Sequence, residues 1–163
     1  QEVHTRMWMD KIGVDDYKQN EIDLVADLIP LLESSNIDMT IFFRLLTNLE
    51  APDVELLNFA FYSPEEIPVD KWNEWLNRWW GCTKGSPNRG KMRGVNPKFV
   101  LRNWMAQLAI DAAEKGDYTV AEELHHLLKS PYAEQSEHES EWFQKRPVWA
   151  DRRVGCSMLS CSS

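Results

Sequence analysis

Apolar residues recur at steps of three and four along most of this chain, which is the spacing of α-helices that bury one face. The clearest set comprises Ile22, Val25, Leu28, Ile29 and Leu32. No segment shows a convincing strand pattern, in which apolar and polar residues alternate. The sequence therefore predicts an all-α fold.

Glycine, proline and capping residues divide this pattern into separate helices. Gly13 and Gly116 are expected to end helices, and Asp38 or Asn36 to cap one. Asp117 is expected to cap the last helix, which ends at Ser130 before Pro131. The helices expected from these signals and from the apolar spacing cover residues 3–12, 20–34, 39–49, 54–61 and 118–129.

Two further helix starts are predicted from proline in the first helical turn. Ser63 is followed by Pro64 and, three residues after the serine, by Glu66, which is the pattern of a capping box. It is expected to open a helix that carries a tryptophan-rich face, formed by Trp72, Trp75, Leu76 and Trp79. We expect this face to lie in a core or a domain interface rather than to stack bases or a ligand. Asn96 and Pro97 are expected to open a long helix.

Residues 81–95 are predicted to form a basic loop. They contain four glycines, one proline, the cations Lys84, Arg89, Lys91 and Arg93, and no acidic residue. Gly85 to Lys91 fits the start of a phosphate-binding loop, but Met92 stands where a serine or threonine should hold magnesium. No strand precedes it either. A loop that contacts an acidic surface, such as another part of the same protein, is the preferred interpretation.

Charge and cysteine usage restrict the partners and the compartment. A net charge of −8 on 163 residues argues against binding to nucleic acids or anionic membranes. No apolar stretch is long enough for a membrane span, and no targeting signal is present. Three cysteines, an odd number, are typical of a reducing compartment.

No catalytic residue and no metal ligand is assigned to the chain. Glu122 with His125, and Glu123 with His126, resemble half of a di-iron helix motif, but no second copy exists. The chain lacks the sequence motifs of kinases. Cys156 and Cys161 are too few and too loosely spaced for zinc. Cys161 is a candidate redox thiol, weighed evenly against an inert cysteine, and Cys156 is near enough in sequence for a local disulfide.

A longer motif points to a family. Residues 95–107 (VNPKFVLRNWMAQ) and 109–117 (AIDAAEKGD) resemble a stretch of the selenoprotein O (YdiU-type) family. The resemblance continues through residues 130–132 (SPY) and 146–150 (RPVWA) to 160–163 (SCSS).

The resemblance implies the helical C-terminal portion of a protein-kinase-like (pseudokinase) fold with an extended C-terminal tail. Family members use ATP and magnesium to transfer AMP to Ser, Thr or Tyr of protein substrates, in bacteria and mitochondria, and are linked to redox homeostasis. Their nucleotide- and metal-binding residues would lie upstream of Gln1, so no cofactor and no activity are expected of this chain alone. Some animal members carry selenocysteine at the position of Cys161.

The resemblance also suggests an organisation. Residues 1–130 would pack on a kinase-like core that precedes them, and residues 131–163 would form an acidic linker and a redox tail. The chain begins with Gln1 instead of Met, and residues 3–12 are expected to be part of a helix already under way, which favours a fragment of a longer protein over a processed mature terminus. The alternative function is a free-standing helical protein-interaction module that uses the tryptophan face and the basic loop.

Overall fold

The computed structural model describes residues 2–15, 19–153 and 156, and it confirms the all-α prediction. Its described residues form helices and no strand, with a single isolated bridge between Ile37 and Phe61. None of the described helices is long and apolar enough to cross a membrane. The kinase-like context of the fold stays a prediction.

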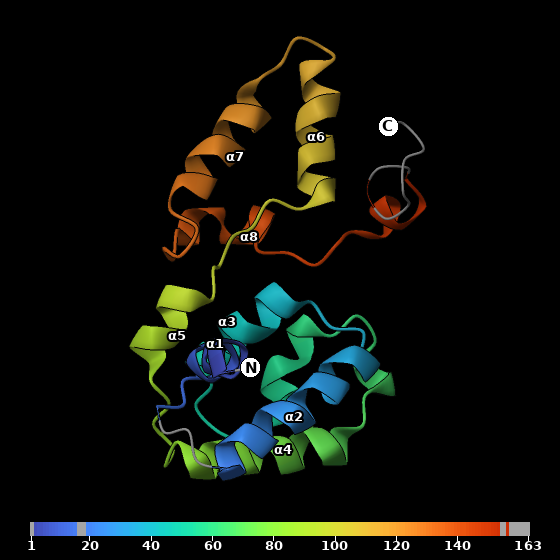
Figure 1. Cartoon of the computed structure of the whole chain (residues 1–163). Coiled ribbons are helices and arrows are strands. Elements are labelled where there is room, and N and C mark those ends of the chain that lie inside the picture. Colours follow the sequence, from blue (N-terminus) through green and yellow to red (C-terminus); the bar gives the residue numbers. More distant parts are fainter. Residues whose placement is uncertain (1, 16–18, 154–155, 157–163) are drawn as a thin grey trace. The chain divides into compact units, whose positions relative to one another are not determined.

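The chain divides into two compact units, residues 1–97 (unit 1) and 98–163 (unit 2) (Figure 1). This division lies upstream of the expected boundary at residue 130. Packing of residues 1–130 on a further core remains untested.

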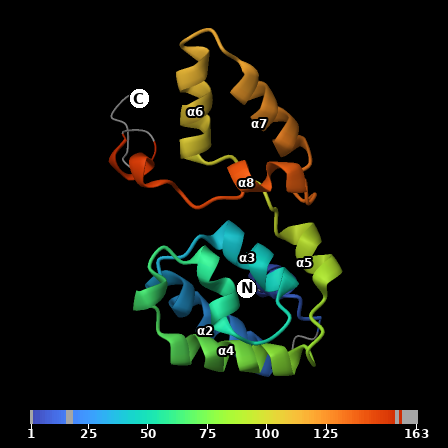
Figure 2. The same ribbon diagram turned by 180° about the vertical axis from the view of Figure 1, so that it is seen from behind.

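Unit 1 is a cluster of helices around aromatic side chains. α2 packs on α4, and α1 packs on α2, α3 and α5 (Figure 2). The elements are α1 (Glu2–Ile12), α2 (Gln19–Ser34), α3 (Met39–Asn48), η1 (Val54–Ala60), η2 (Pro64–Glu66), α4 (Val69–Cys82) and α5 (Arg89–Val95), where η marks a 3₁₀ helix. The first three helices follow the predicted ranges closely, and the Asp38 carboxylate caps α3 by accepting from the Ile41 amide.

The tryptophan face of α4 is the core of unit 1, as predicted. Trp72, Trp75 and Trp79 are each at most 2% exposed. The Trp72 indole donates to Ser35 Oγ at 2.9 Å, that of Trp75 to the Leu24 carbonyl at 2.8 Å, and that of Trp79 to the Ile12 carbonyl at 2.8 Å. A buried N–H needs such an acceptor, so these bonds fix α4 against the end of α1 and against α2 with the residue that follows it.

The predicted capping box at Ser63 is wrong. Ser63 makes no capping hydrogen bond, and Pro64–Glu66 form only one 3₁₀ turn. Pro68 explains the interruption, because a proline disfavours helical geometry in the residue before it. Ile67 is accordingly extended, and α4 begins at Val69.

The predicted loop over residues 81–95 is also wrong in its second half. Asn88 caps α5 by accepting a hydrogen bond from the Lys91 amide at 3.0 Å. Met92 is fully buried and fastens this short helix to the rest of unit 1. Capping and one apolar anchor thus outweigh the low helix propensity of its two glycines.

Asn96 ends a helix instead of opening one. Its buried side chain donates to the Lys11 carbonyl at 2.8 Å, and its backbone is extended before Pro97. The amides of Lys98 and Phe99 both donate to the Pro131 carbonyl, at 2.8 and 3.1 Å, which holds this stretch outside a helix. The long helix therefore starts only at Asn103.

Unit 2 is a helical hairpin closed by the chain that follows it. Its elements are α6 (Asn103–Ala113), α7 (Thr119–Lys129), η3 (Ser136–His138), α8 (Glu139–Trp142) and η4 (Val148–Arg152). Trp104 of α6 stacks on Trp142 of α8 at 6.0 Å between ring centroids. Residues 133–141 are mostly exposed, as expected, and lead into this buried tryptophan. The expected extended tail contains η4, whose Ala150 is fully buried.

Candidate functional site

The two cysteines predicted to carry redox chemistry differ in what the structure describes. Cys161 lies outside the described residues. Cys156 is a free cysteine and only 6% exposed. Its Sγ lies 4.0 Å from the Asn103 carbonyl oxygen, and its own carbonyl accepts from Asn103 Nδ2 at 3.4 Å. The thiol is therefore held against the start of α6.

An ion pair fixes the chain just before Cys156 to the same helix. The Arg153 guanidinium donates to both oxygens of Asp111, each at 2.6 Å, and Gln107 Nε2 donates to Asp111 Oδ1 at 2.9 Å. These bonds, that of Arg153 first, lower the pKa of the Asp111 carboxyl, and the same pair raises the pKa of Arg153. We call Asp111, Arg153, Asn103 and Cys156 the tail clasp.

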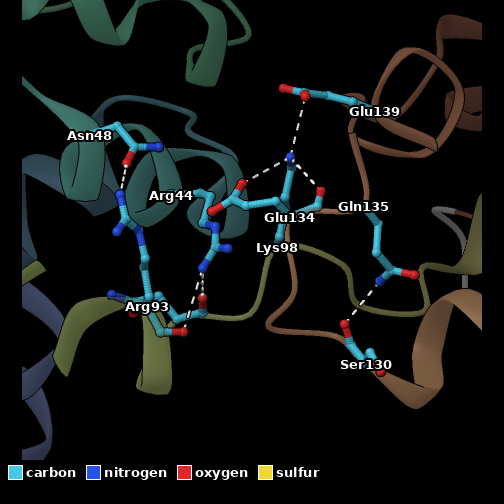
Figure 3. A network of polar contacts seen from close by, with 9 residues as sticks. Arg44, Asn48, Arg93, Lys98, Ser130, Glu134, Gln135 and Glu139 are labelled. Atoms are coloured by element: carbon cyan, nitrogen blue, oxygen red, sulfur yellow. Dashed lines mark hydrogen bonds and ion pairs between the residues drawn. The ribbon is translucent and has the colours of Figure 1, made fainter. Parts of the chain in front are cut away.

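A buried lysine organises the acidic segment that precedes the tail (Figure 3). Lys98 has a side chain only 4% exposed. Its ammonium donates to the Glu134 carbonyl at 2.7 Å and lies 3.2 and 3.3 Å from the carboxylates of Glu134 and Glu139. The rings of Phe99 and Phe143 both lie 5.6 Å from it. The acidic residues therefore neutralise a desolvated cation, as burial of a charge requires.

Gln135 closes the end of α7 within the same segment. Its side-chain amide donates to the Leu127 carbonyl at 3.1 Å and to the Ser130 carbonyl at 2.9 Å (Figure 3). Carbonyls at a helix end lack partners in the helix, and here a side chain supplies the donor. Neither the Lys98 contacts nor this closure was predicted, because both join residues that no sequence motif connects.

Three of the four basic residues of segment 81–95, Arg89, Lys91 and Arg93, make contacts inside unit 1, and Lys84 is exposed. Lys91 Nζ lies 2.6 Å from Asp15 and 3.4 Å from Asp10, and the bond to Asp15 is the main cause of its raised pKa. Arg93 donates to Asn48 Oδ1 at 3.0 Å (Figure 3). Lys91, the lysine of the phosphate-loop-like stretch, thus pairs with carboxylates of its own chain.

The glutamates and histidines of α7 do not gather into a metal site. Glu123 Oε1 accepts from the Trp142 indole at 2.8 Å and lies 3.2 Å from His138 Nδ1, while His125 and His126 are exposed. Within residues 2–15, 19–153 and 156, no three His, Cys, Asp or Glu side chains are placed to hold an ion.

Comparison with known proteins gives one consistent result. A family model described as "Protein adenylyltransferase SelO" matches residues 1–129. A protein nucleotidyltransferase YdiU of Flavobacterium johnsoniae is 42% identical over 98% of this chain and 33% of its own length. Its namesakes in Aromatoleum aromaticum and Tolumonas auensis are 44% and 40% identical, over 99% and 94% of the chain. The chain spans about a third of the length of these relatives.

Proposed function

The chain belongs to the SelO protein adenylyltransferase family, and we propose that it is the helical C-terminal portion of a kinase-like enzyme that transfers AMP from ATP to Ser, Thr or Tyr of proteins. The nucleotidyltransferase name of its relatives supports the reaction class. Their bacterial sources favour the bacterial cytoplasm over a mitochondrion.

The reacting groups are assigned to the two thirds of the family's polypeptide that this chain does not span. ATP needs a phosphate cradle and magnesium needs carboxylate oxygens, and magnesium would neutralise the phosphate charge. Lys91 does not fit the first role, because Asp10 and Asp15 already pair with it. The described residues offer no metal-binding cluster for the second. The role proposed for this chain alone is structural and regulatory.

The regulatory role we propose is the placement of the redox tail. The observation that carries it is the tail clasp, in which Asp111 holds Arg153 and Asn103 holds the backbone of Cys156. The clasp fixes the point five residues before Cys161. From there Cys161 is proposed to pair with a cysteine of the rest of the polypeptide, or with Cys156 if the clasp opens.

Such a pairing needs an oxidant. Two thiols lose two protons and two electrons when the disulfide forms, and a peroxide that takes them up yields water or an alcohol and water. The resulting disulfide would join the tail to its partner covalently and so report the redox state to the enzyme.

The alternative of a free-standing module that binds through its tryptophan face is not favoured. Trp72, Trp75 and Trp79 are buried inside unit 1, so the face is already covered by its own chain.

The activity assignment is tested by AMP transfer. The 163-residue chain and the full-length Flavobacterium johnsoniae relative are each incubated with labelled ATP, magnesium and a mixed protein acceptor. We expect transfer by the relative and background signal from the chain. Transfer by the chain would place the catalytic groups here, and no transfer by the relative would remove the proposed reaction.

The redox role is tested in a chimera in which this chain replaces the matched third of that relative. AMP transfer is compared for the chimera and its Cys161→Ser variant, after peroxide and after dithiothreitol. We expect oxidation to change the rate only where Cys161 is present, with Cys82→Ser as the matched control. Equal responses of all three proteins would eliminate the switch.

A further inference from the structure

Two neighbouring hollows on unit 1 share Trp8 and Met39 in their walls. One has a volume of about 230 Å³ and is also lined by Lys11 and Phe43. The other has about 350 Å³ and is also lined by Leu32 and Glu33, among others. Since they share two side chains, they form one surface groove over α1, α2 and α3, which we call the Trp8 groove.

The groove exposes apolar surface at Met39 and Trp8. Met39 is 40% exposed, and the Trp8 indole lies half-buried with its ring 6.0 Å from that of Phe43. Contiguous apolar hollows with polar residues at their edges are typical of surfaces that bind protein.

Lys11 in this groove is a partly desolvated cation without a carboxylate partner among the described residues. Its Nζ donates to Asn96 Oδ1 at 3.3 Å and lies 4.8 Å from the Phe43 ring centroid, and burial lowers its pKa. By contrast, Lys91 and Lys98 each contact two carboxylates. Lys11 therefore has the environment of a half-formed ion pair.

We propose that the Trp8 groove receives an apolar segment of the family's polypeptide outside this chain, with an Asp or Glu of that segment bound to Lys11. This inference rests on the proposed function, since it gives the missing part of the enzyme a docking surface on this one. About two thirds of the relatives' length lies outside the part matched here, so a covering segment is available. Glu33 lines the hollow that Lys11 does not line, and it favours a Lys or Arg of the docked segment at that end. The two charges together set the orientation in which the segment lies along the groove.

A second copy of this chain is a poorer occupant. Each copy carries a net charge of −8, so two copies repel each other.

Oxidative footprinting tests the proposal on the isolated chain and on the chimera with the Flavobacterium johnsoniae relative. Mass spectrometry measures peroxide oxidation of Met39, with Met7 as the internal control because it is 45% exposed and lines neither hollow. We expect Met39 oxidation to fall severalfold in the chimera while Met7 stays unchanged. Equal Met39 oxidation in both proteins overturns the proposal, and so does protection of Met39 already in the isolated chain.

A charge reversal tests the role of Lys11. Lys11→Glu is expected to restore Met39 oxidation in the chimera and to leave it unchanged in the isolated chain. Lys84→Glu, at an exposed lysine that lines neither hollow, is expected to leave Met39 protected in the chimera and its oxidation unchanged in the isolated chain. Full protection of Met39 in the Lys11→Glu chimera overturns the assigned ion pair.

Two further results separate this proposal from the proposed function. A chimera that transfers AMP with Met39 fully exposed overturns the groove assignment alone. If Met39 is protected in the chimera but neither the chimera nor the relative transfers AMP, the enzymatic proposal is overturned and the groove assignment stands. A second chimera, with the Aromatoleum aromaticum relative, replaces the first if that one does not fold.

Discussion

At the residue scale, two stacked tryptophans of unit 2 differ in how their N–H groups are satisfied. The Trp142 indole donates to Glu123 at 2.8 Å, whereas the buried Trp104 indole nitrogen has no hydrogen-bond partner among the residues that the structure describes. A buried donor without an acceptor costs free energy, while a bonded one contributes to stability.

Phenylalanine substitution should separate these two cases. Both variants lose ring volume, but only Trp142→Phe also loses a hydrogen bond. We expect Trp142→Phe to lower the free energy of unfolding by about 1–3 kcal/mol more than Trp104→Phe. Urea denaturation of both variants measures the difference, and equal losses would contradict the hydrogen-bond argument.

The tail clasp should respond to acid in a defined direction. The pKa of Asp111 is lowered in the folded chain, mainly by Arg153, so the clasp contributes stability above the ordinary aspartate pKa. That contribution is lost as the pH falls through the lowered value.

In Arg153→Gln the pKa of Asp111 is expected to rise toward its ordinary value, because the largest cause of the shift is removed. NMR titration of the side-chain carboxyl measures it. Asp117 is an internal control, since its lowered pKa comes mainly from hydrogen bonds with Thr119 and should not change. An unchanged Asp111 pKa would show that the ion pair does not form in solution.

At the scale of elements, the sequence was sufficient to predict the bounds of a helix where helical spacing of apolar residues and a local start or stop signal coincide. Residues 3–12, 20–34 and 39–49 were predicted almost as observed, because Gly13 and Asp38 bound their periodic patterns. The errors lie where contacts between residues far apart in the sequence determine where a helix begins or ends. Asn96 forms a hydrogen bond with the Lys11 backbone, and the Pro131 carbonyl holds residues 98 and 99, neither of which is visible in a local pattern.

Two substitutions compare the cap that the structure shows, at Asn88, with the cap that was predicted wrongly, at Ser63. Asn88→Ala removes the side chain that caps α5 and should lower the free energy of unfolding by about 1 kcal/mol. Ser63→Ala should cost less than about 0.5 kcal/mol, because Ser63 makes no capping bond. Thermal and urea unfolding measure both, and a larger loss for Ser63→Ala would reinstate the predicted capping box.

At the scale of the whole molecule, the candidate site was predicted only in part. Cys156 and Cys161 were predicted from their residue type and position, and Cys161 lies outside the described residues; Arg153, Asp111 and Lys98 were not predicted. Their roles depend on pairs 36 to 42 residues apart in the chain. No periodicity or motif relates residues at that separation, so only the folded structure reveals them.

The division at residue 97 predicts that unit 1 folds alone. Its core tryptophans and all three acceptors of their N–H bonds lie within residues 1–97. A polypeptide of these residues should retain a cooperative unfolding transition and near-ultraviolet circular dichroism. A broad, non-cooperative transition would show that unit 1 requires the rest of the chain.

The stacking of Trp75 on Trp79 also has a spectroscopic consequence. Their indole planes are 6° from parallel, with centroids 6.2 Å apart, so their electronic transitions couple as an exciton pair. This pair should give the protein a bisignate far-ultraviolet band beside the helical signal. Trp104 and Trp142 of unit 2 also stack, with centroids 6.0 Å apart, so the band of unit 1 is read from a polypeptide of residues 1–97, which lacks that second pair and needs no attached dye.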